Sequence, residues 1–246
     1  MEQKIKLILE YDGTAYCGWQ RQLYQPTVQE TIEVALGKIY NQKVVIVGAS
    51  RTDTGVHALR QVAHFVPPQS LQQINYVKAI NSNLPSDVRI LEATSESIDF
   101  DANRSAISKI YEYKILNKKK PSAIHRNFSW WLPIPLDIAS MYKASNHLIG
   151  RHDFKVFCAS DSHIKTTVRE VFEVHWYERE EFLIFMIHGS GFLKQMVRSI
   201  VGSVVEVGRH KWSISNFETV LHSKDRSLAG PTAPARGLYL KDVFYS

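Results

Sequence analysis

The chain has 246 residues, 44% of them hydrophobic and 22% charged, an ordinary globular composition that allows one large domain or two small ones. Lys and Arg number 30 against 24 Asp and Glu, so the formal net charge is +6, which suits a polyanionic partner such as nucleic acid. Two cysteines outside any CxxC pair exclude a disulfide framework, the opening residues lack signal-peptide features, and the longest apolar runs are too short to cross a bilayer, so we expect a cytoplasmic protein that enters no membrane.

The first half of the chain predicts a strand, helix, strand, strand, helix, strand order. Alternating apolar residues over 4–11 are typical of a half-buried strand, and Asp12-Gly13 predicts a turn. Thr27 to Glu30 has the form of a capping box, in which the hydroxyl and the carboxylate satisfy first-turn amides of a helix. Apolar residues then follow at helical spacing. The other expected elements are strands at 44–48, 60–66 and 87–93 and a helix over 71–82.

The second half repeats this rhythm. Its expected elements are a strand at 109–116, a helix over 136–148, hairpin strands at 171–177 and 182–189, a long helix from Met196 to Val207, a helix over 214–222 and a closing strand at 237–245. The repeated order predicts an α+β fold of two similar units. We place these units at residues 1–104 and 105–246, and we expect them to pack tightly because no Gly/Ser-rich linker separates them.

The groups that could carry chemistry gather in residues 49–58, ASRTDTGVHA, between two expected strands. Loops at strand ends often hold catalytic groups. This one offers the carboxylate of Asp53, the guanidinium of Arg51 and a glycine that permits a sharp turn. Without further context, the segment is equally compatible with a polar turn that Asp53 caps. The ten histidines show no familiar metal-ligand spacing and no Gly-rich cofactor loop is present, so we expect neither a metal nor a cofactor.

Six segments resemble, in the correct order, motifs of the tRNA pseudouridine synthase A family. The string around Asp53 is similar to the family's RTDAGVHA motif. The other five are LEYDGTAYCGWQRQ with TVQE, NSNLPSDV, FDANRSAISKIYEYKI, GSGFLKQMVRSIVGSVVEVG and KDRSLAGPTAPARGLYL. Six ordered matches carry far more weight than a single RTD string would.

This resemblance implies a tRNA pseudouridine synthase that isomerises uridine in the anticodon stem-loop, at nucleotides 38 to 40. It makes Asp53 the nucleophile, which either attacks ribose C1′ or assists elimination to a glycal, and the sequence leaves both routes open. It makes Arg198 the partner of this carboxylate, because a nearby guanidinium favours the ionised form. Arg198 lies among apolar neighbours on the expected long helix, where an arginine needs a specific partner. Tyr111 is expected to pack against the target uracil and is a candidate to help remove the C5 proton.

The implied substrate adds expectations about RNA contacts. The target base lies in a stem and must be flipped out, at a cost of a few kcal/mol. We assign Arg51 to flipping and positioning, because its planar head can stack or bind phosphate. Ser50 and Thr54 stand where many relatives carry Gly and Ala, so Ser50 would be strained if that position required a positive φ. The further expected phosphate contacts are Arg21, Arg104, Lys109 and the lysine run 118–120.

The resemblance also implies an architecture and partners. We expect two ferredoxin-like halves that form one extended mixed or antiparallel sheet with helices on one face, and a central basic cleft where Asp53 faces Tyr111 and Arg198. We expect a homodimer with tRNA contacting both subunits. Two other functions stay open: an RNA-binding module without chemistry, which would have no need of the nucleophile, and a nucleoside or sugar hydrolase, which would need a second carboxylate.

Overall fold

The structure is a computed structural model that describes residues 3–68, 74–160 and 164–246. The chain forms two compact units: unit 1 comprises Met1–Ile107 with Tyr239–Ser246, and unit 2 comprises Ser108–Leu238. The division predicted from the sequence, 1–104 and 105–246, differs from these units at the C-terminus. The closing strand belongs with unit 1 because Tyr239 and Leu240 pair in parallel with His57 and Ala58.

Unit 1 is built on a strand flanked by two antiparallel neighbours. Its elements are β1 (Gln3–Tyr11), the 3-10 turn η1 (Gly13–Ala15), α1 (Val28–Tyr40), β2 (Val47–Gly48), β3 (His57–Phe65), α2 (Tyr76–Asn81), β4 (Val88–Ser97) and most of β10 (Leu238–Tyr245). Strand β1 lies between β4 and β3 and is antiparallel to both. The edge of β3 that faces away from β1 pairs with two strands: β2 pairs with the end of β3 in antiparallel orientation, and β10 pairs with the start of β3 in parallel orientation.

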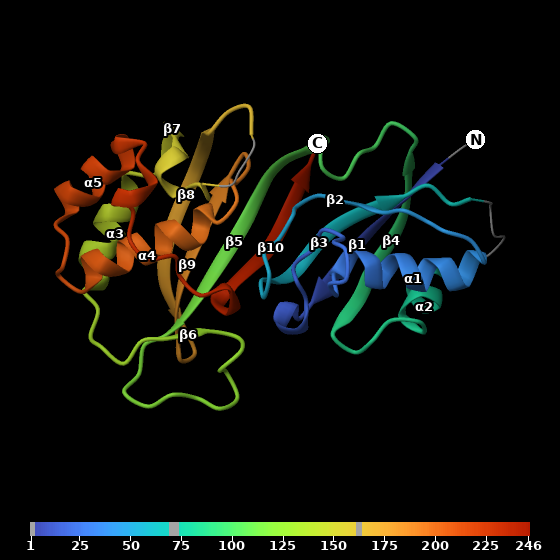
Figure 1. Ribbon diagram of the computed structural model, residues 1–246, viewed down its shortest axis with the longest axis horizontal. Coiled ribbons are helices and arrows are strands. Elements are labelled where there is room, and N and C mark those ends of the chain that lie inside the picture. Colours follow the sequence, from blue (N-terminus) through green and yellow to red (C-terminus); the bar gives the residue numbers. More distant parts are fainter. Residues whose placement is uncertain (1–2, 69–73, 161–163) are drawn as a thin grey trace. The chain divides into compact units, whose positions relative to one another are not determined.

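The predicted alternation of the first strand is confirmed, since Ile5, Leu7, Leu9 and Tyr11 are all buried. Figure 1 shows α1 and α2 side by side against the strands of unit 1, in agreement with their contacts with each other and of α2 with β4. The strand expected at 44–48 is only two residues long. The helix expected over 71–82 is present from Tyr76, while 71–73 lie outside the described residues.

The capping box expected at the start of α1 is wrong in its hydrogen bonds, although the helix begins where it was predicted. Thr27 is the N-cap residue, but its buried hydroxyl finds no partner among the described residues. The amides of Val28 and Gln29 instead donate to the carbonyl oxygens of Gly18 and Trp19, at 3.2 and 3.1 Å. Because the chain before the helix supplies these acceptors, the cap does not need the threonine side chain.

Unit 2 holds a second set of strands with three helices. Its elements are most of β5 (Ala106–Leu116), β6 (Trp130–Trp131), α3 (Ile138–Asn146), β7 (Gly150–Asp153), the 3-10 turn η2 (Phe154–Phe157), β8 (Val168–Arg179), β9 (Phe182–Gly189), α4 (Met196–Gly208), α5 (Ile214–Ser223) and the 3-10 turns η3 (Arg226–Leu228) and η4 (Ala235–Gly237). The strands run β5-β9-β8-β7 with antiparallel neighbours, and β6 extends the end of β5 in parallel. The predicted hairpin, strands and helices are confirmed, and the short β6 and β7 were not predicted.

The helices of unit 2 pack with one another. Figure 1 shows α3, α4 and α5 grouped on one side of β8 and β9, and α3 contacts both other helices and β8. The indole Nε1 of Trp176 on β8 donates to the Ser145 hydroxyl on α3 at 2.9 Å. Mixed strand pairing together with separate helices confirms the α+β class.

The segment that follows η3 lies directly on α4. The amide of Gly230 donates to the Ser203 hydroxyl at 2.9 Å, and the amide of Ala233 donates to the carbonyl oxygen of Arg198 at 3.1 Å. A Cβ added to Gly202 would overlap the carbonyl oxygen of Pro231. A glycine is therefore required at this crossing for steric reasons.

We expect Gly202→Ala to lower the free energy of unfolding by about 1–3 kcal/mol, the usual cost of overpacking a tight contact. Gly37→Ala on α1 is the matched control, because its Cβ would meet only the Gln42 carbonyl oxygen at 3.5 Å. That control should be stabilised by roughly 0.5–1 kcal/mol, since Ala is the better helix former. Urea unfolding of both variants measures the difference, and equal behaviour would contradict the close approach.

Candidate active site

The loop that carries Asp53 begins at a fixed point beside β3. The amide of Ala49 donates to the carbonyl oxygen of Val62 at 2.7 Å. The side chain of Gln61, which is fully buried, makes two bonds with Ser50: its Oε1 accepts from the Ser50 amide at 3.2 Å, and its Nε2 donates to the Ser50 carbonyl at 2.8 Å. The Gln61 side chain thus bonds the backbone of Ser50 as a neighbouring strand would, and together with the Val62 carbonyl it fixes residues 49 and 50 beside β3.

The next part of the loop is held by the segment after β1. The amide of Trp19 donates to the Thr52 carbonyl at 3.1 Å, and the amide of Gly55 donates to the Tyr16 carbonyl at 3.2 Å. The hydroxyls of Thr52 and Tyr11 lie 2.8 Å apart. Gly18 has φ +89°, and a Cβ there would lie 2.5 Å from the Thr52 carbonyl oxygen. The segment LEYDGTAYCGWQRQ, one of the six that resemble family motifs, therefore supports the segment that carries Asp53.

Asp53 itself occupies a turn at the surface of this support. Its side chain is half-buried, Thr52 before it is buried, and Arg51 is exposed. The carbonyl of Asp53 accepts from the Val56 amide at 3.1 Å, and the chain turns at Gly55 with φ +76°. Neither Ser50 nor Thr54 has a positive φ, so these departures from the family pattern bring no backbone strain.

The loop ends at a buried histidine that the sequence did not single out. His57 is 1% exposed, and its Nδ1 accepts from the Gly13 amide at 3.0 Å and lies 3.2 Å from the Asp12 carboxylate. Its ring stacks on Tyr239 of β10, with centroids 4.8 Å apart. The histidine thus joins the loop, the turn after β1 and the last strand of unit 1.

Tyr111, the aromatic residue predicted for the site, lies in unit 2. Tyr111 on β5 is 6% exposed, and its ring meets Phe192 edge to face, with centroids 5.0 Å apart. Tyr113, two residues along the same face, donates its hydroxyl to the Pro234 carbonyl at 2.7 Å, and burial raises its pKa. The two tyrosines are thus fixed by packing and by a hydrogen bond respectively.

Arg198 lies in the first turn of α4, and its guanidinium is half-buried. Its Nε donates to the Ala233 carbonyl at 2.8 Å, and its own carbonyl accepts from the Ala233 amide at 3.1 Å. Two bonds to one residue fix both the backbone and the side chain. Tyr113 reaches the neighbouring Pro234 and its pKa responds to the charge of Arg198, so the two side chains are close to each other within unit 2.

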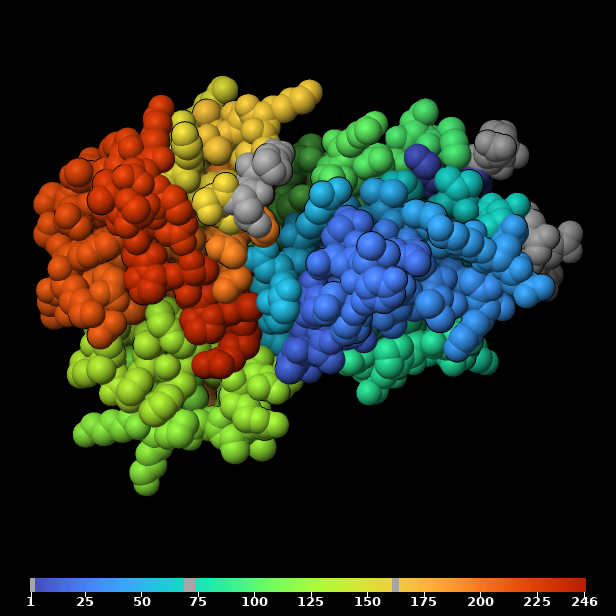
Figure 2. Space-filling view, in the orientation of Figure 1, coloured from blue at the N-terminus to red at the C-terminus, as the bar shows by residue number. Residues whose placement is uncertain are grey.

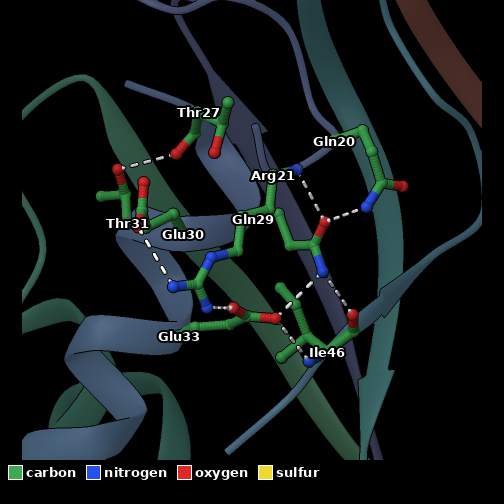
Figure 3. A network of polar contacts seen from close by, with 8 residues as sticks. All are labelled: Gln20, Arg21, Thr27, Gln29, Glu30, Thr31, Glu33 and Ile46. Carbon is green, nitrogen blue, oxygen red and sulfur yellow. Dashed lines mark hydrogen bonds and ion pairs between the residues drawn. The ribbon is translucent and has the colours of Figure 1, made fainter. Parts of the chain in front are cut away.

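Arg21 is engaged by carboxylates. Its guanidinium lies 3.5 Å from Glu30 and 3.2 Å from Glu33, and its amide donates to the Gln29 side chain at 3.0 Å (Figure 3). Because Glu33 is 6% exposed in its side chain and needs a counter-charge, Arg21 is poorly suited to give up these partners for a phosphate. Arg104 is exposed, beyond a turn in which its amide donates to Asp101 at 2.8 Å.

Lys109 lies on β5, two residues before Tyr111 and on the same face. Burial, reinforced by the positive charge of Arg169, lowers its pKa to about 8. A lysine in this environment loses part of its charge just above neutral pH, which makes it sensitive to any anion that approaches.

Comparison with known proteins identifies the family. A family model described as tRNA pseudouridine synthase matches residues 7–103 and 144–246. The chain is 42% identical over 243 residues to tRNA pseudouridine synthase A of Caldicellulosiruptor bescii, covering 99% of this chain and all of that protein. The corresponding proteins of Acetivibrio thermocellus and Geotalea daltonii are each 43% identical, with the same coverage.

The chain belongs to the tRNA pseudouridine synthase family. It is therefore an isomerase that modifies RNA, and the resemblance drawn from its motifs is confirmed. The two matched stretches contain Asp53 and Arg198, whereas Tyr111 and Lys109 fall between them. The roles of individual residues stay predictions.

Three further features of the described residues bear on the sequence predictions. None of their helices combines the length and the apolar character needed to cross a membrane. They contain no group of three or more His, Cys, Asp or Glu arranged to hold a metal ion. Cys17 and Cys158 are both free thiols.

We expect Gly18→Ala to lower the rate of the synthase by about a hundredfold, because displacement of a catalytic group by about 1 Å can cost this much. The added methyl would push on the Thr52 carbonyl next to Asp53. Gly150→Ala is the matched control, since Gly150 also has a positive φ, +105°, but its Cβ would meet only the His152 ring at 3.5 Å. Both variants carry the strain of a positive φ, and Gly18→Ala should also lose stability to the overlap with the Thr52 carbonyl, so the two rates are compared at a temperature at which thermal unfolding shows both variants folded. Similar activity in both would contradict the role of the Gly18 contact.

Proposed function

We propose that this synthase converts uridine to pseudouridine in the anticodon stem-loop of tRNA, at nucleotides 38 to 40, with Asp53 as the nucleophile. The observation that carries the proposal is family membership over the full chain together with an intact RTD motif. The bond between uracil N1 and ribose C1′ breaks, the base turns, and C5 joins C1′. The C5 proton leaves and N1 gains a proton, so atoms and electrons balance without a co-reactant.

The local structure supports Asp53 in this role. A nucleophile must be held in a defined position by neighbours that are themselves fixed. The loop on both sides of Asp53 is bonded to β3 and to the segment after β1, through Gln61, Trp19 and Tyr11. The carboxylate either attacks C1′ or assists elimination to a glycal, and both routes use the same placement.

Arg198 and Tyr111 complete the proposed site. Arg198 would keep the Asp53 carboxylate ionised, and its bonds to Ala233 hold it in one orientation. Tyr111 would pack on the flipped uracil, and it has a rigid backing in Phe192. Arg51 is exposed beside the nucleophile, where its planar head can stack in the stem or bind a phosphate as the base leaves.

The proposal extends to architecture and assembly. The order β4-β1-β3 with β2 on the far edge, antiparallel throughout, fits a ferredoxin-like half. Strands β5, β9 and β8 with α3 and α4 fit a second half. We propose that the halves share an extended sheet, with helices on one face, and a central basic cleft where Asp53 meets Tyr111 and Arg198, and that two chains form a homodimer around tRNA.

The first test uses tRNA transcripts with tritium at uridine C5. Wild-type protein should release tritium to water with the RNA chain intact, and Asp53→Asn should reduce release by at least about a thousandfold, as loss of a nucleophile does. Asp99→Asn is the matched control, because Asp99 is an exposed aspartate of unit 1 outside the loop. It should keep wild-type activity.

The outcomes separate the competing functions. Equal release by wild type and Asp53→Asn would remove Asp53 as nucleophile. Free uracil in the supernatant would point to a hydrolase. Tight tRNA binding without release by any variant would leave an RNA-binding module. Mapping pseudouridine in the product RNA tests nucleotides 38 to 40.

A second test concerns Lys109. If its ammonium binds a tRNA phosphate, affinity should fall as pH rises through its pKa of about 8, because the lysine is mostly charged at pH 7 and mostly neutral at pH 9. We expect the Kd to rise about five- to tenfold, because the charged fraction of a lysine with this pKa falls about tenfold between pH 7 and pH 9. Lys109→Arg keeps its charge over this range and should show no such step. The same step in both proteins would assign the pH dependence to another group.

A further inference from the structure

Unit 2 contains a recess of about 690 Å³ outside the predicted site residues. The described residues that line it are Lys155, Cys158, Ala159, Ser160, Ile164, Lys165, Thr166, Thr167, Lys224, Asp225 and Arg226. In Figure 2 the segments around η2 and after α5, yellow and red, lie next to each other on the viewed face of unit 2. The recess therefore opens where two segments distant in sequence meet.

Four of the lining side chains carry positive charge and one carries negative charge. The negative one is Asp225, whose carboxylate accepts hydrogen bonds from the amide and the hydroxyl of Ser227 at 2.9 and 2.8 Å. Lys224 lies 3.3 Å from Asp153 just outside the lining. Within the described part of the chain, the ammonium groups of Lys155 and Lys165 have no carboxylate partner. Among the described lining residues, positive charge thus exceeds negative charge, and an anion would neutralise the excess.

The walls of the recess are fixed by internal hydrogen bonds. The Arg226 guanidinium donates to the Thr232 and Ser199 hydroxyls, at 2.7 and 3.3 Å. Arg169 donates to the carbonyl oxygens of Thr166 and Val168, at 3.0 and 2.6 Å. The backbone that presents Lys165 is therefore positioned in advance, and hydroxyls beside the lysines can donate further hydrogen bonds to phosphate oxygens.

Two chains of contacts connect the recess with the proposed site. On one side, Arg226 contacts Ser199, the residue after Arg198 on α4. On the other side, the Arg169 side chain lies 3.7 Å from the position of a Cβ on Gly191, which precedes the Phe192 ring packed on Tyr111. The recess and the residues assigned to the target uridine are thus neighbours within unit 2.

We propose that this recess binds phosphate groups of the tRNA strand that flanks the target uridine, with Lys155 and Lys165 as the two contacts. This inference rests on the proposed function, since it takes tRNA as the substrate. Phosphate contacts fix register without reading bases, so the recess would hold the strand beside Arg198 and Tyr111, the residues of unit 2 assigned to the proposed site. Its effect belongs in substrate binding and its salt dependence, and the chemical step is unaffected.

The test compares wild type with Lys155→Ala/Lys165→Ala, using tritium release for KM and kcat and filter binding of tRNA over a range of KCl concentrations. We expect KM and Kd to rise at least about tenfold with kcat within twofold, and the slope of log Kd against log salt to fall by about one per lysine removed. Lys143→Ala/Lys211→Ala removes two exposed lysines of unit 2 outside the recess and should change neither. Lys155→Arg/Lys165→Arg should restore binding, which excludes damage to the fold as the cause.

Several outcomes would overturn the proposal. An unchanged salt slope in the double alanine variant would do so, as would an equal loss in the Lys143/Lys211 control. Altered inhibition by inorganic phosphate or uridine monophosphate without a change in tRNA affinity would assign the recess to a small phosphate ligand instead. Tritium release by the wild type is measured separately. Its absence, combined with tRNA binding that depends on the recess, would reject the proposed function and keep the recess.

Discussion

The structure of unit 1 depends on the bond between the Trp19 amide and the Thr52 carbonyl. Gly18 must lie close to Thr52 for this bond to form, and only a residue without a Cβ fits there. The same segment continues into α1 and caps its first amides through the Gly18 and Trp19 carbonyls. One stretch of chain therefore holds both the loop of Asp53 and the start of the first helix, and neither can move without the other.

In unit 2 a different segment holds the side chains proposed for the site. Residues 230–234 lie along α4, where they bond Arg198 and Ser203 and receive the Tyr113 hydroxyl. A residue on a buried helix that bonds a crossing segment through both its side chain and its backbone carbonyl, as Arg198 does, has little freedom to choose another rotamer. Both units thus hold the side chains proposed for the site through backbone contacts that a glycine permits, and rigid placement of this kind suits a reaction that depends on positioning and electrostatics.

The sequence predicted most elements, because alternation and helical spacing follow directly from burial, as Leu7 and Leu9 on β1 illustrate. Prediction from the sequence failed for features that depend on contacts between segments distant in the chain. Thr27 stands at the N-cap, yet backbone carbonyls replace its hydroxyl. The short β6 and β7 were not predicted, because strands of two and four residues have too few positions to show a periodic pattern. Motif resemblance assigned Asp53 and Arg198 to the site, and these roles stay predictions. Gln61 was not singled out, since a polar residue inside a strand has the same pattern whether it faces water or bonds a loop.

The net charge of +6 does not show which of the Lys and Arg side chains already have partners within the protein. Arg21 is held by Glu30 and Glu33, and Arg226 by hydroxyls. A cation already in a bond must exchange one partner for another when a phosphate arrives, so its net gain is small. Lys155 and Lys165 have no such carboxylate to exchange within the described residues. Salt-dependent binding of RNA should therefore depend more on Lys155 and Lys165 than on Arg21 and Arg226, and a count of Lys and Arg overestimates it.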